Sequence, residues 1–441
     1  MNMRIYKSIT LLIFLSVFNL HAQNQTSTIT LSSFEETWNY ALKNNPDQKS
    51  YLLNIEKAKA DKITSQSFLW PSINGSFSGQ YNIELPTTPI PGEIIGKPGT
   101  TIYAQFGQKY NYSTGITVSR ELLNWQNYMQ LKLAQNNILT TQLQADAYKQ
   151  SLKQQVALYY FTTAIAQEAL ETNRRNLADA DSIVILTKQK QQQGLINTIS
   201  ANQALINRNN IQQQIASSEM LVYQCKISLK ILCGLNVNAD LQLNVLELKS
   251  QQIVSPNQNL NPDKNLAIAE TQVKGMKYKV DMQKSAYLPK LKANWYIGEQ
   301  QYRNDFGLSF DSKDWYVNKY LGVSLQVPIF NGFSTSSRVK SSKIEYQKAQ
   351  TDWDESKRKA ALNDDLLIKN FTQSSLIAQT NQENYRLYSQ NEQIANQQFR
   401  AGIISLDDYL KISEDYLKAE NNYLNSLSTL YNYYSTIISR Q

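Results

Sequence analysis

The stretch Phe399-Arg400-Ala401-Gly402-Ile403-Ile404-Ser405 decides the fold, because the chain carries an earlier copy of it. The copy, Gln191-Gln192-Gln193-Gly194-Leu195-Ile196-Asn197, lies about 208 residues before it, and each glycine interrupts a long run with no proline and no other glycine. A lone glycine between two helical runs is typical of a helix end followed by a reversal of the chain. Each copy therefore predicts the tip of a long helical hairpin.

The segments that precede each tip also recur in the same order. The proline-led segment Trp70-Pro71-Ser72-Ile73 corresponds to Leu288-Pro289-Lys290-Leu291. Residues 115–124, an alternating segment that ends in Leu-Leu-Asn, correspond to residues 322–331, which end in Ile-Phe-Asn. Both halves have strands and very long helices in the same order. A duplication of this size indicates a protein whose role depends on its architecture rather than on catalysis.

Four short segments alternate between apolar and polar residues: 72–81, 110–119, 291–298 and 321–327. This period of two predicts strands with one apolar and one polar face. Each segment has about ten residues, which is the length that a tilted strand needs to cross a bilayer. The alternation puts Ile116 and Val323 on the face toward lipid, and Thr117 and Ser324 on the face toward a lumen. Any one of these strands would also fit a sheet of a soluble sandwich.

The ends of these strands are rich in aromatic residues: Trp70, Tyr81, Tyr110, Trp295, Tyr302, Trp315 and Tyr320. Strand ends are where the interfacial aromatic girdle of a membrane barrel lies. The strands form two hairpins, the first with a long loop over residues 82–109 that is rich in proline and glycine, and the second with a shorter loop over residues 303–318. Long polar loops on one side fit the extracellular face of such a barrel.

Very long helices are predicted after each strand hairpin. Residues 124–193 contain no proline and no glycine before the tip, and would form a rod of about 100 Å. Residues 331–401 repeat this length. On the return helix, alternating four- and three-residue steps predict a coiled-coil seam: Ile211, Ile215, Ser218, Val222, Cys225, Leu229 and Leu232. The outgoing helix has a seven-residue repeat: Leu131, Ile138, Ala145, Leu152 and Tyr159.

The N-terminus has the three parts of a secretory signal. Arg4 and Lys7 precede an apolar run from Ile9 to Phe18, and Ala22 ends a plausible cleavage site. The apolar run is too short to cross a bilayer as a helix, and no later run reaches the required length. If the mature chain spans a membrane, we therefore expect it to do so through strands.

Composition argues against most catalytic chemistry. The only histidine, His21, lies in the signal, so the mature chain lacks the imidazole of catalytic triads and of most zinc sites. Cys225 and Cys233 are eight helical residues apart, too far for a disulfide within one helix, and are interpreted as packed apolar residues. The formal net charge is +8, but lysine and arginine are scattered among acidic residues. This pattern indicates solvated faces rather than a nucleic-acid site.

Taken together, the order and spacing of these segments resemble the TolC-type outer-membrane efflux and secretion channels. The best local matches are Asn44-Asn45-Pro46, Tyr287-Leu288-Pro289, residues 327–332 and residues 399–410. The predicted organisation is an α+β protomer with an internal duplication. Its parts are a signal peptide (1–22), an N-terminal periplasmic helix (23–69), a first β-hairpin (70–119), a first helical hairpin (120–233), a linker (234–262), a periplasmic helix (263–288), a second β-hairpin (289–328) and a second helical hairpin (329–441).

The resemblance implies an outer-membrane homotrimer. Each protomer would lend four strands to a twelve-stranded barrel, and its helices would continue as a periplasmic tunnel that narrows at the tips. Four strands alone cannot close a barrel, so the strand count also favours an oligomer. The protein would be a passive exit duct for efflux or type I secretion, with a periplasmic adaptor and an inner-membrane transporter as partners. The tip residues Gly194, Leu195, Gly402 and Ile403 would contact the adaptor.

The resemblance also implies an acidic ring just after a tip glycine, which falls on Asp408. The next acidic position of the family falls on Lys411, and the equivalent of Asp408 in the first half is Ser200. A shift of one residue in the alignment would put Asp407 in the lumen instead. Asp408 is equally well interpreted as a residue at a helix start, favoured by the helix dipole.

Two functions of other classes remain open from the sequence. The first is a soluble periplasmic coiled-coil scaffold or adaptor, and the second is a surface enzyme or adhesin that uses the loop around residues 86–98. We expect no enzymatic activity, cofactor, metal site or nucleic-acid partner.

Overall fold

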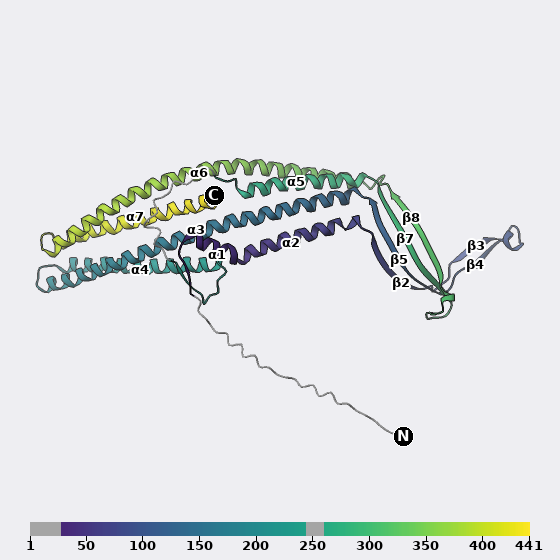
Figure 1. Ribbon diagram of the computed structural model, residues 1–441, viewed down its shortest axis with the longest axis horizontal. Helices are drawn as coiled ribbons and strands as arrows, with labels where there is room; N and C mark the ends of the chain where they lie inside the picture. The colour runs from purple at the N-terminus through teal and green to yellow at the C-terminus, as the bar shows by residue number, and fades with distance from the viewer. Residues whose placement is uncertain (1–27, 244–259) are drawn as a thin grey trace, which may run out of the picture.

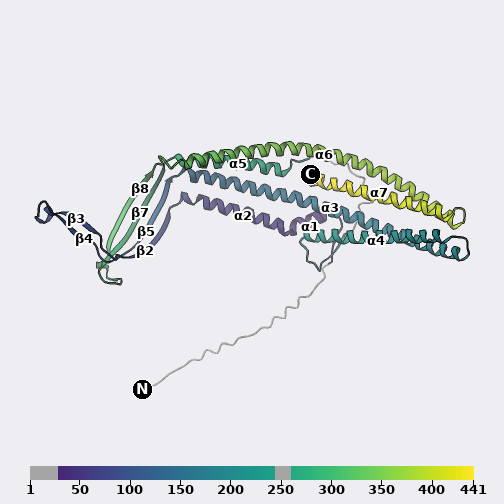
Figure 2. The same cartoon turned by 180° about the vertical axis from the view of Figure 1, so that it is seen from behind.

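The computed structural model describes residues 28–243 and 260–441. The predicted signal peptide, residues 1–22, and residues 244–259 of the predicted linker lie outside the described residues. The protein is elongated, with long helices over most of its length and a sheet at one end (Figure 1). Seen from behind, the strands bend away from the common direction of the helices (Figure 2). The sheet and the hairpin tips therefore lie at opposite ends of the molecule.

Two helical hairpins form the body of the protein. The first consists of α3 (Trp125–Gln192) and α4 (Thr198–Leu232), and the second of α6 (Ser334–Arg400) and α7 (Leu406–Ile438). With 68 and 67 residues, α3 and α6 are each about 100 Å long. Within residues 28–243 and 260–441, no helix combines the length and the apolar character needed to cross a membrane.

The predicted coiled-coil seams face the neighbouring helices. On α4, Ile211, Cys225 and Leu229 are buried, and the other seam residues are half-buried. On α3, Ala145 and Leu152 are buried. Both cysteines carry free thiols, and burial raises the pKa of the Cys233 thiol to about 12. They therefore pack as small apolar residues, as the sequence predicts.

The largest apolar cluster lies midway along the helices, where the two hairpins meet the N-terminal segment. It includes Leu31, Phe34, Trp38, Leu152, Val156, Phe161, Leu229, Cys233, Leu241 and Tyr431. The rings of Phe161 and Tyr431 stack with their centroids 4.5 Å apart, which joins α3 to α7. Burial of each large apolar side chain stabilises this junction by about 1.5–3 kcal/mol.

The segment of residues 23–69, predicted as an N-terminal helix, is mostly helical in its described part but is divided into several elements. The described part of this segment forms β1 (Thr28–Leu31), α1 (Phe34–Asn44), α2 (Pro46–Gln66) and the short η1 (Ser67–Leu69). The helix breaks at Asn45, because a residue before proline is disfavoured in the α conformation, and its ψ is 123°. The Asn45 side chain then accepts a hydrogen bond from the backbone N–H of Gln48 at 2.8 Å and so caps α2.

The segment between the two halves, predicted as a linker over residues 234–262, contains a short strand. Its Leu241-Gln242-Leu243 stretch belongs to β6 (Asp240–Leu243), which pairs with β1 in parallel. Farther along the chain, α5 (Lys264–Lys284) packs between α3 and α6, and η4 (Ser285–Tyr287) leads into the second pair of strands. The two strands of this small sheet are about 200 residues apart in sequence. Their pairing brings the end of the first half of the chain next to its beginning.

The four predicted strands form one antiparallel sheet. They are β2 (Ser72–Tyr81), β5 (Tyr110–Leu123), β7 (Lys290–Arg303) and β8 (Tyr316–Gln326), in the order β2-β5-β7-β8. The contact between β5 and β7 joins the two halves of the duplication. Within the described ranges, β2 and β8 each have only one partner strand, so both outer edges of the sheet are open.

The register of the sheet assigns its two faces. Ile116 lies opposite Ile297, and Val323 lies opposite Ala293, on one face. Thr117 lies opposite Tyr296 on the other face, which also carries Ser324. The sequence alternation predicted this division. The prediction of the aromatic girdle was partly wrong, since alternation along the strands puts Tyr302 and Tyr320 on the Thr117 face, whereas Tyr81, Tyr110 and Trp295 lie on the Ile116 face.

The loop between β2 and β5 contains structure of its own. Its strands β3 (Thr87–Pro91) and β4 (Thr101–Gln105) pair as a hairpin, with η2 (Gly92–Ile95) at its end. This hairpin projects beyond the main sheet (Figure 1). The corresponding loop between β7 and β8 contains only the short η5 (Ser312–Asp314).

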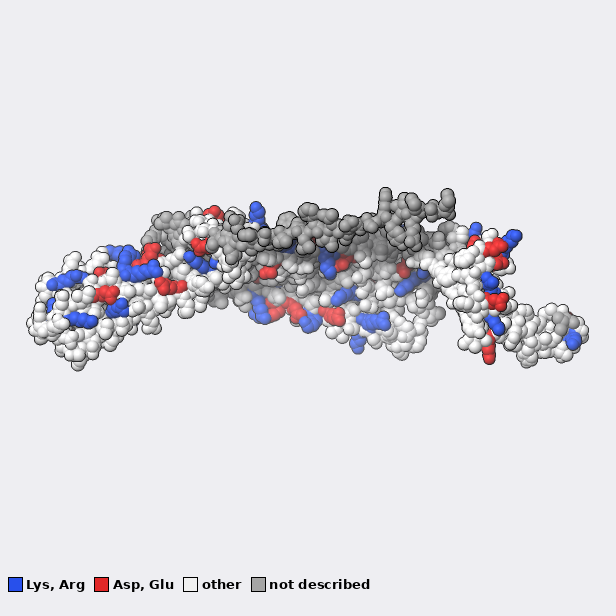
Figure 3. Space-filling model, turned by 90° about the horizontal axis from the view of Figure 1, so that it is seen from below, with Lys and Arg blue, Asp and Glu red and all other residues white. Residues whose placement is uncertain are grey.

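Charged residues of both signs are mixed over the helices (Figure 3). Several form local ion pairs on α6, such as Lys348 with Asp352 at 2.7 Å and Arg386 with Glu383 at 2.6 Å. Their side chains are mostly exposed, so each pair contributes little to stability. The mixture agrees with the solvated faces expected from the sequence.

Candidate functional site

The two hairpin tips have the same backbone conformation. Gly194 and Gly402 have φ values of 71° and 78°, in the left-handed region that side chains disfavour. After each glycine, a backbone N–H returns to the preceding helix, from Leu195 to Lys190 at 2.9 Å and from Ile403 to Gln398 at 2.8 Å. This pair of hydrogen bonds is the glycine-terminated helix end expected at both positions.

An apolar side chain projects from each tip. Leu195 is 70% exposed and Ile403 is 71% exposed, while the following residues, Ile196 and Ile404, pack against the helices. Each tip therefore presents one aliphatic side chain at the end of the molecule. These two side chains therefore contribute little to the packing of their own protomer.

Asp408 lies in the first turn of α7, where it takes part in the helix cap. The Ser405 hydroxyl accepts a hydrogen bond from the Asp408 backbone N–H at 3.1 Å and donates one to its carboxylate at 2.6 Å. Asp407 precedes it, and both carboxylates are exposed in the protomer. Asp408 thus has the helix-start role that the sequence left open, and it keeps an exposed charge as well.

Ser200 does not mirror Asp408 on the other hairpin. Its backbone N–H donates to the Asn197 side chain at 2.8 Å, which caps α4, but the residue itself is buried. The first turn of α4 carries no acidic residue. Only the second hairpin therefore brings charge to this end of the molecule at the start of its return helix.

Lys411 continues an exposed stripe of alternating charge along α7. The stripe consists of Asp408, Lys411, Asp415 and Lys418, with Asp407 and Glu414 beside it. Within the described part of the chain, no ion pair joins Lys411 to either aspartate of the first turn. The sequence analysis included Lys411 but not Glu414, Asp415 or Lys418. The spacing of three and four residues, which puts charged side chains on one helix face, was the available signal.

The ends of all four long helices pack into one cluster just above the tips. Its buried members are Ile183, Ala204, Ala395, Phe399, Leu406, Tyr409 and Leu410. The rings of Phe399 and Tyr409 stack at 5.5 Å, and the Lys190 ammonium lies 4.6 Å from the Phe399 ring centroid. The two tips are thus held to each other within one protomer.

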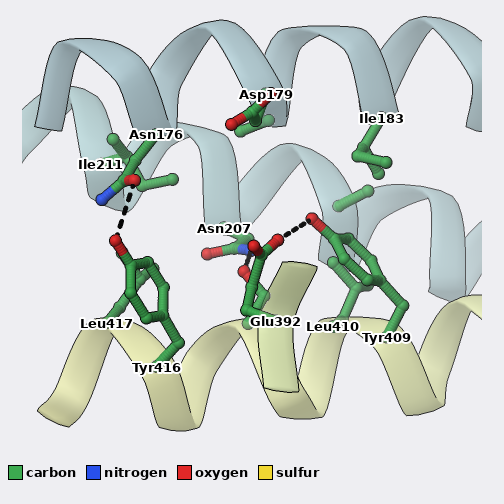
Figure 4. Close-up of a pocket in the computed structure, with 13 residues that line it drawn as sticks. Asn176, Asp179, Ile183, Asn207, Ile211, Glu392, Tyr409, Leu410, Tyr416 and Leu417 are labelled. Atoms are coloured by element: carbon green, nitrogen blue, oxygen red, sulfur yellow. Dashed lines mark hydrogen bonds between the residues drawn. The ribbon is translucent and has the colours of Figure 1, made fainter. Parts of the chain in front are cut away.

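Farther from the tips, polar side chains link the two hairpins (Figure 4). The Tyr416 hydroxyl of α7 donates to the Asn176 side chain of α3 at 3.3 Å. The Asn207 amide of α4 donates to the Ser413 hydroxyl of α7, also at 3.3 Å. The Tyr409 hydroxyl donates to Glu392 of α6 at 3.0 Å, which closes the second hairpin on itself. Long hydrogen bonds between neutral groups contribute about 1 kcal/mol each, and the buried cluster of Ala180, Ile211, Tyr416 and Leu417 adds apolar packing between the same hairpins.

Two carboxyl groups lie in this interface, with Glu420 buried and Glu392 half-buried. Burial raises the pKa of Glu392, and the charge of Asp179 on α3 raises it further. Burial also raises the pKa of Glu420, one turn beyond Tyr416, to about 7. Sequence reasoning missed Glu420, yet it occupies a buried position in the same three- and four-residue spacing as Tyr409, Ser413 and Tyr416. A charged residue at a core position of a helix was the available signal.

The described residues were also compared with the ligand sets of metal sites. Over residues 28–243 and 260–441, no group of three or more histidine, cysteine or acidic side chains is arranged to hold a metal ion. The features that remain are geometric: long paired helices, two apolar tips, a charged stripe and an open-edged sheet.

Comparison with known proteins identifies the architecture. A profile of the outer membrane efflux protein family matches residues 38–235 and 255–437. The chain belongs to this family. It is similar to the outer membrane protein TolC of Vibrio cholerae serotype O1, with 23% identity over 338 residues that cover 74% of this chain and 72% of the relative.

Solved structures of outer-membrane channels have the same fold. The Campylobacter jejuni CmeC channel matches 92% of this chain and 85% of its own, with a TM-score of 0.76 and 19% identity. The Neisseria gonorrhoeae MtrE channel, in an open state, matches 92% of this chain and 88% of its own, with a TM-score of 0.72 and 16% identity. As a family member, the protein is an outer-membrane efflux channel whose helices lie on the periplasmic side. The family is one of channels rather than of enzymes.

Proposed function

We propose that three copies of the chain form the channel, each contributing its four strands to a twelve-stranded barrel. The observation that carries this proposal is the pair of open edges on β2 and β8. An unpaired edge exposes backbone hydrogen-bonding groups, which are costly to leave unsatisfied in a membrane. Pairing β8 of one protomer with β2 of the next satisfies both edges, and three four-stranded sheets are enough to enclose a water-filled lumen.

The lumen would be lined by the polar face of the sheet, which carries Thr117 and Ser324, and would continue between the long helices. The protein would act as a passive exit duct, because a wide polar passage selects little among solutes. An inner-membrane transporter would supply the energy and the choice of substrate. The alternative of a soluble periplasmic scaffold predicts a protein that is monodisperse without detergent.

The hairpin tips would dock a periplasmic adaptor. Leu195 and Ile403 support this role, because each is exposed at the end of a hairpin whose backbone is fixed by a left-handed glycine. An apolar side chain on a rigid turn loses little conformational entropy when it enters a partner's pocket. Replacement of both by serine should weaken adaptor binding without changing trimer formation.

The charged stripe on α7 would form the gate. Three protomers would bring three copies of Asp408 near the axis, with three copies of Lys411 about one helical turn away. Opposite charges on neighbouring protomers would hold the closed ends together and bias the ions that pass. Asp407, Asp408 and Lys411 are free to make such contacts, because within the described residues none of them forms an ion pair in its own protomer.

Single-channel conductance in planar bilayers tests the channel and its gate together. Asp408→Ala should raise the open probability and weaken block by multivalent cations, whereas Lys411→Asp should strengthen that block. Asp407→Ala tests the alternative register, in which Asp407 rather than Asp408 faces the lumen. Unchanged gating in both aspartate variants would place the constriction elsewhere, and the absence of any conductance from the trimer would exclude the channel proposal.

A further inference from the structure

The connection between β7 and β8 folds back over the sheet instead of extending beyond it. We define residues 304–315 as the β7–β8 flap. The Gln301 amide donates to the Ser309 carbonyl, and its carbonyl accepts from the Ser309 N–H, both at 3.0 Å. The Trp315 indole donates to the same Ser309 carbonyl at 2.8 Å. These bonds fix the middle of the flap, and they leave Gln301 completely buried.

The flap lies on the face of the sheet that carries Ile116 and Ile297. Gln301 is four residues from Ile297 on β7, so the two share a face. It lies opposite Tyr112, which shares the same face with Ile116 on β5. The Gly307 N–H donates to the Tyr112 hydroxyl at 3.4 Å. The flap therefore covers the outer surface of its own two central strands, rather than the lumen or the edges where neighbouring protomers would pair.

The position of the flap relative to the bilayer follows from where this face of the sheet changes from apolar to polar. On this face the unbroken apolar run lies toward the helices and ends at Ile297 on β7 and at Leu321 on β8. Glu299 and Lys319 follow, and Val317 lies opposite Glu299. The flap contacts the sheet one row beyond Glu299, where Gln301 binds Ser309. Since the helices are periplasmic, it sits at the outer margin of the apolar belt, where lipid headgroups meet acyl chains.

The flap nevertheless presents large apolar side chains. Phe306 is 85% exposed and Phe310 is 93% exposed, although Phe306 touches the Tyr110 ring edge to face at 5.7 Å. Exposed phenylalanines on a segment held against a membrane-facing surface continue that surface. The loop between β2 and β5 differs, because its hairpin projects away from the sheet (Figures 1 and 2).

We propose that the β7–β8 flap is a lipid-binding element of the outer leaflet, with Phe306 and Phe310 inserted among the acyl chains just below the headgroups. Apolar side chains such as phenylalanine bury on the acyl side of this boundary region. The flap anchors each protomer from its own outer face, independently of the contacts that assemble the trimer. Gln301 is the positioning residue, because its two hydrogen bonds keep the flap flat against the sheet.

The test is the accessibility of a nitroxide label to oxygen and to a water-soluble nickel chelate. The full-length protein is reconstituted in vesicles of phosphatidylethanolamine and phosphatidylglycerol. The native Cys225 and Cys233 are buried, so a label at Phe310→Cys is selective. Val323→Cys reports the membrane-facing sheet, and Lys97→Cys reports the aqueous end of the β3–β4 hairpin.

The ratio of oxygen to nickel collision rates should be several-fold higher at position 310 than at position 97, and close to that at position 323. A ratio at 310 equal to that at 97 would overturn the proposal, as would protection of 310 from both reagents, which indicates cover by protein. A low ratio at 323 would instead contradict the proposed barrel. Gln301→Ala should lower the ratio at 310, and an unchanged ratio would remove Gln301 from its positioning role.

Discussion

Replacement of Glu420 by glutamine should remove a pH dependence from the contact between α3 and α7. Glu420 is only 4% exposed. One of its carboxyl oxygens accepts a hydrogen bond from the Asn176 amide at 2.9 Å, and the other has no donor among the described residues. Burial raises its pKa from 4.5 to about 7, opposed by the Asn176 hydrogen bond and the Arg175 charge and reinforced by Glu168.

The sign of the effect follows from this raised pKa. The neutral carboxyl is favoured in the packed interface, so its contribution to stability is complete below the unfolded pKa and is lost as pH rises through about 7. Between about pH 5 and about pH 8, the free energy of opening should fall by about 2.5 kcal/mol, which is a factor of about 70 in the opening constant. Glutamine keeps the shape of the neutral acid and cannot ionise, so Glu420→Gln should lose this contribution around residue 420 and keep only the contribution of Glu392 on α6.

Hydrogen–deuterium exchange of the α7 segment around residue 420, corrected for the intrinsic effect of pH on exchange, measures this opening. Glu414→Gln is the matched control, because Glu414 is exposed on the same helix. It should retain the pH dependence of the wild type. The reasoning is refuted if Glu420→Gln also retains it, since the titrating group would then lie elsewhere.

Two predictions concern the sheet. Ile116→Arg should cost about 2–4 kcal/mol and block trimer assembly, whereas Thr117→Arg should be tolerated because it faces water; equal trimer yields on native gels would reverse the face assignment. Gly298→Ala should cost about 1–3 kcal/mol, because a Cβ there would lie 2.5 Å from the Thr114 carbonyl oxygen. Gly75→Ala, in open space, should leave the thermal dissociation of the trimer unchanged.

The features that the sequence predicted well are those set by local periodicity. Residues 124–193 lack helix breakers, so a continuous helix was the only regular structure that could cover them. The alternation around Ile116 likewise fixed which face of the strand is apolar, because a strand repeats every two residues. Gly194 and Gly402 marked the tips, since few other residues tolerate the left-handed conformation that ends each helix.

The features that the sequence missed depend on contacts between distant segments. β1 and β6 are four residues each and become strands only by pairing with each other, so neither carries a periodic signal of its own. Residues 82–109 were predicted as a loop, yet β3 accommodates Pro89 and Pro91 because it pairs on one side only. The Asn176–Tyr416 hydrogen bond depends on how two helices rotate against each other, which no single-helix pattern determines.

The near-equal lengths of α3 and α6 determine the shape of the far end of the assembly. They differ by one residue, so the tips marked by Gly194 and Gly402 would be level to within about 1.5 Å. In a trimer, the six hairpin tips would then end at one level, and a partner with a flat surface could contact all of them. Removal of seven residues from α6 alone would draw the Gly402 tip of each protomer back by about 10 Å. Only the three Gly194 tips would then reach the end of the assembly. Matched removal from both halves would shorten the tube and leave all six tips at one level.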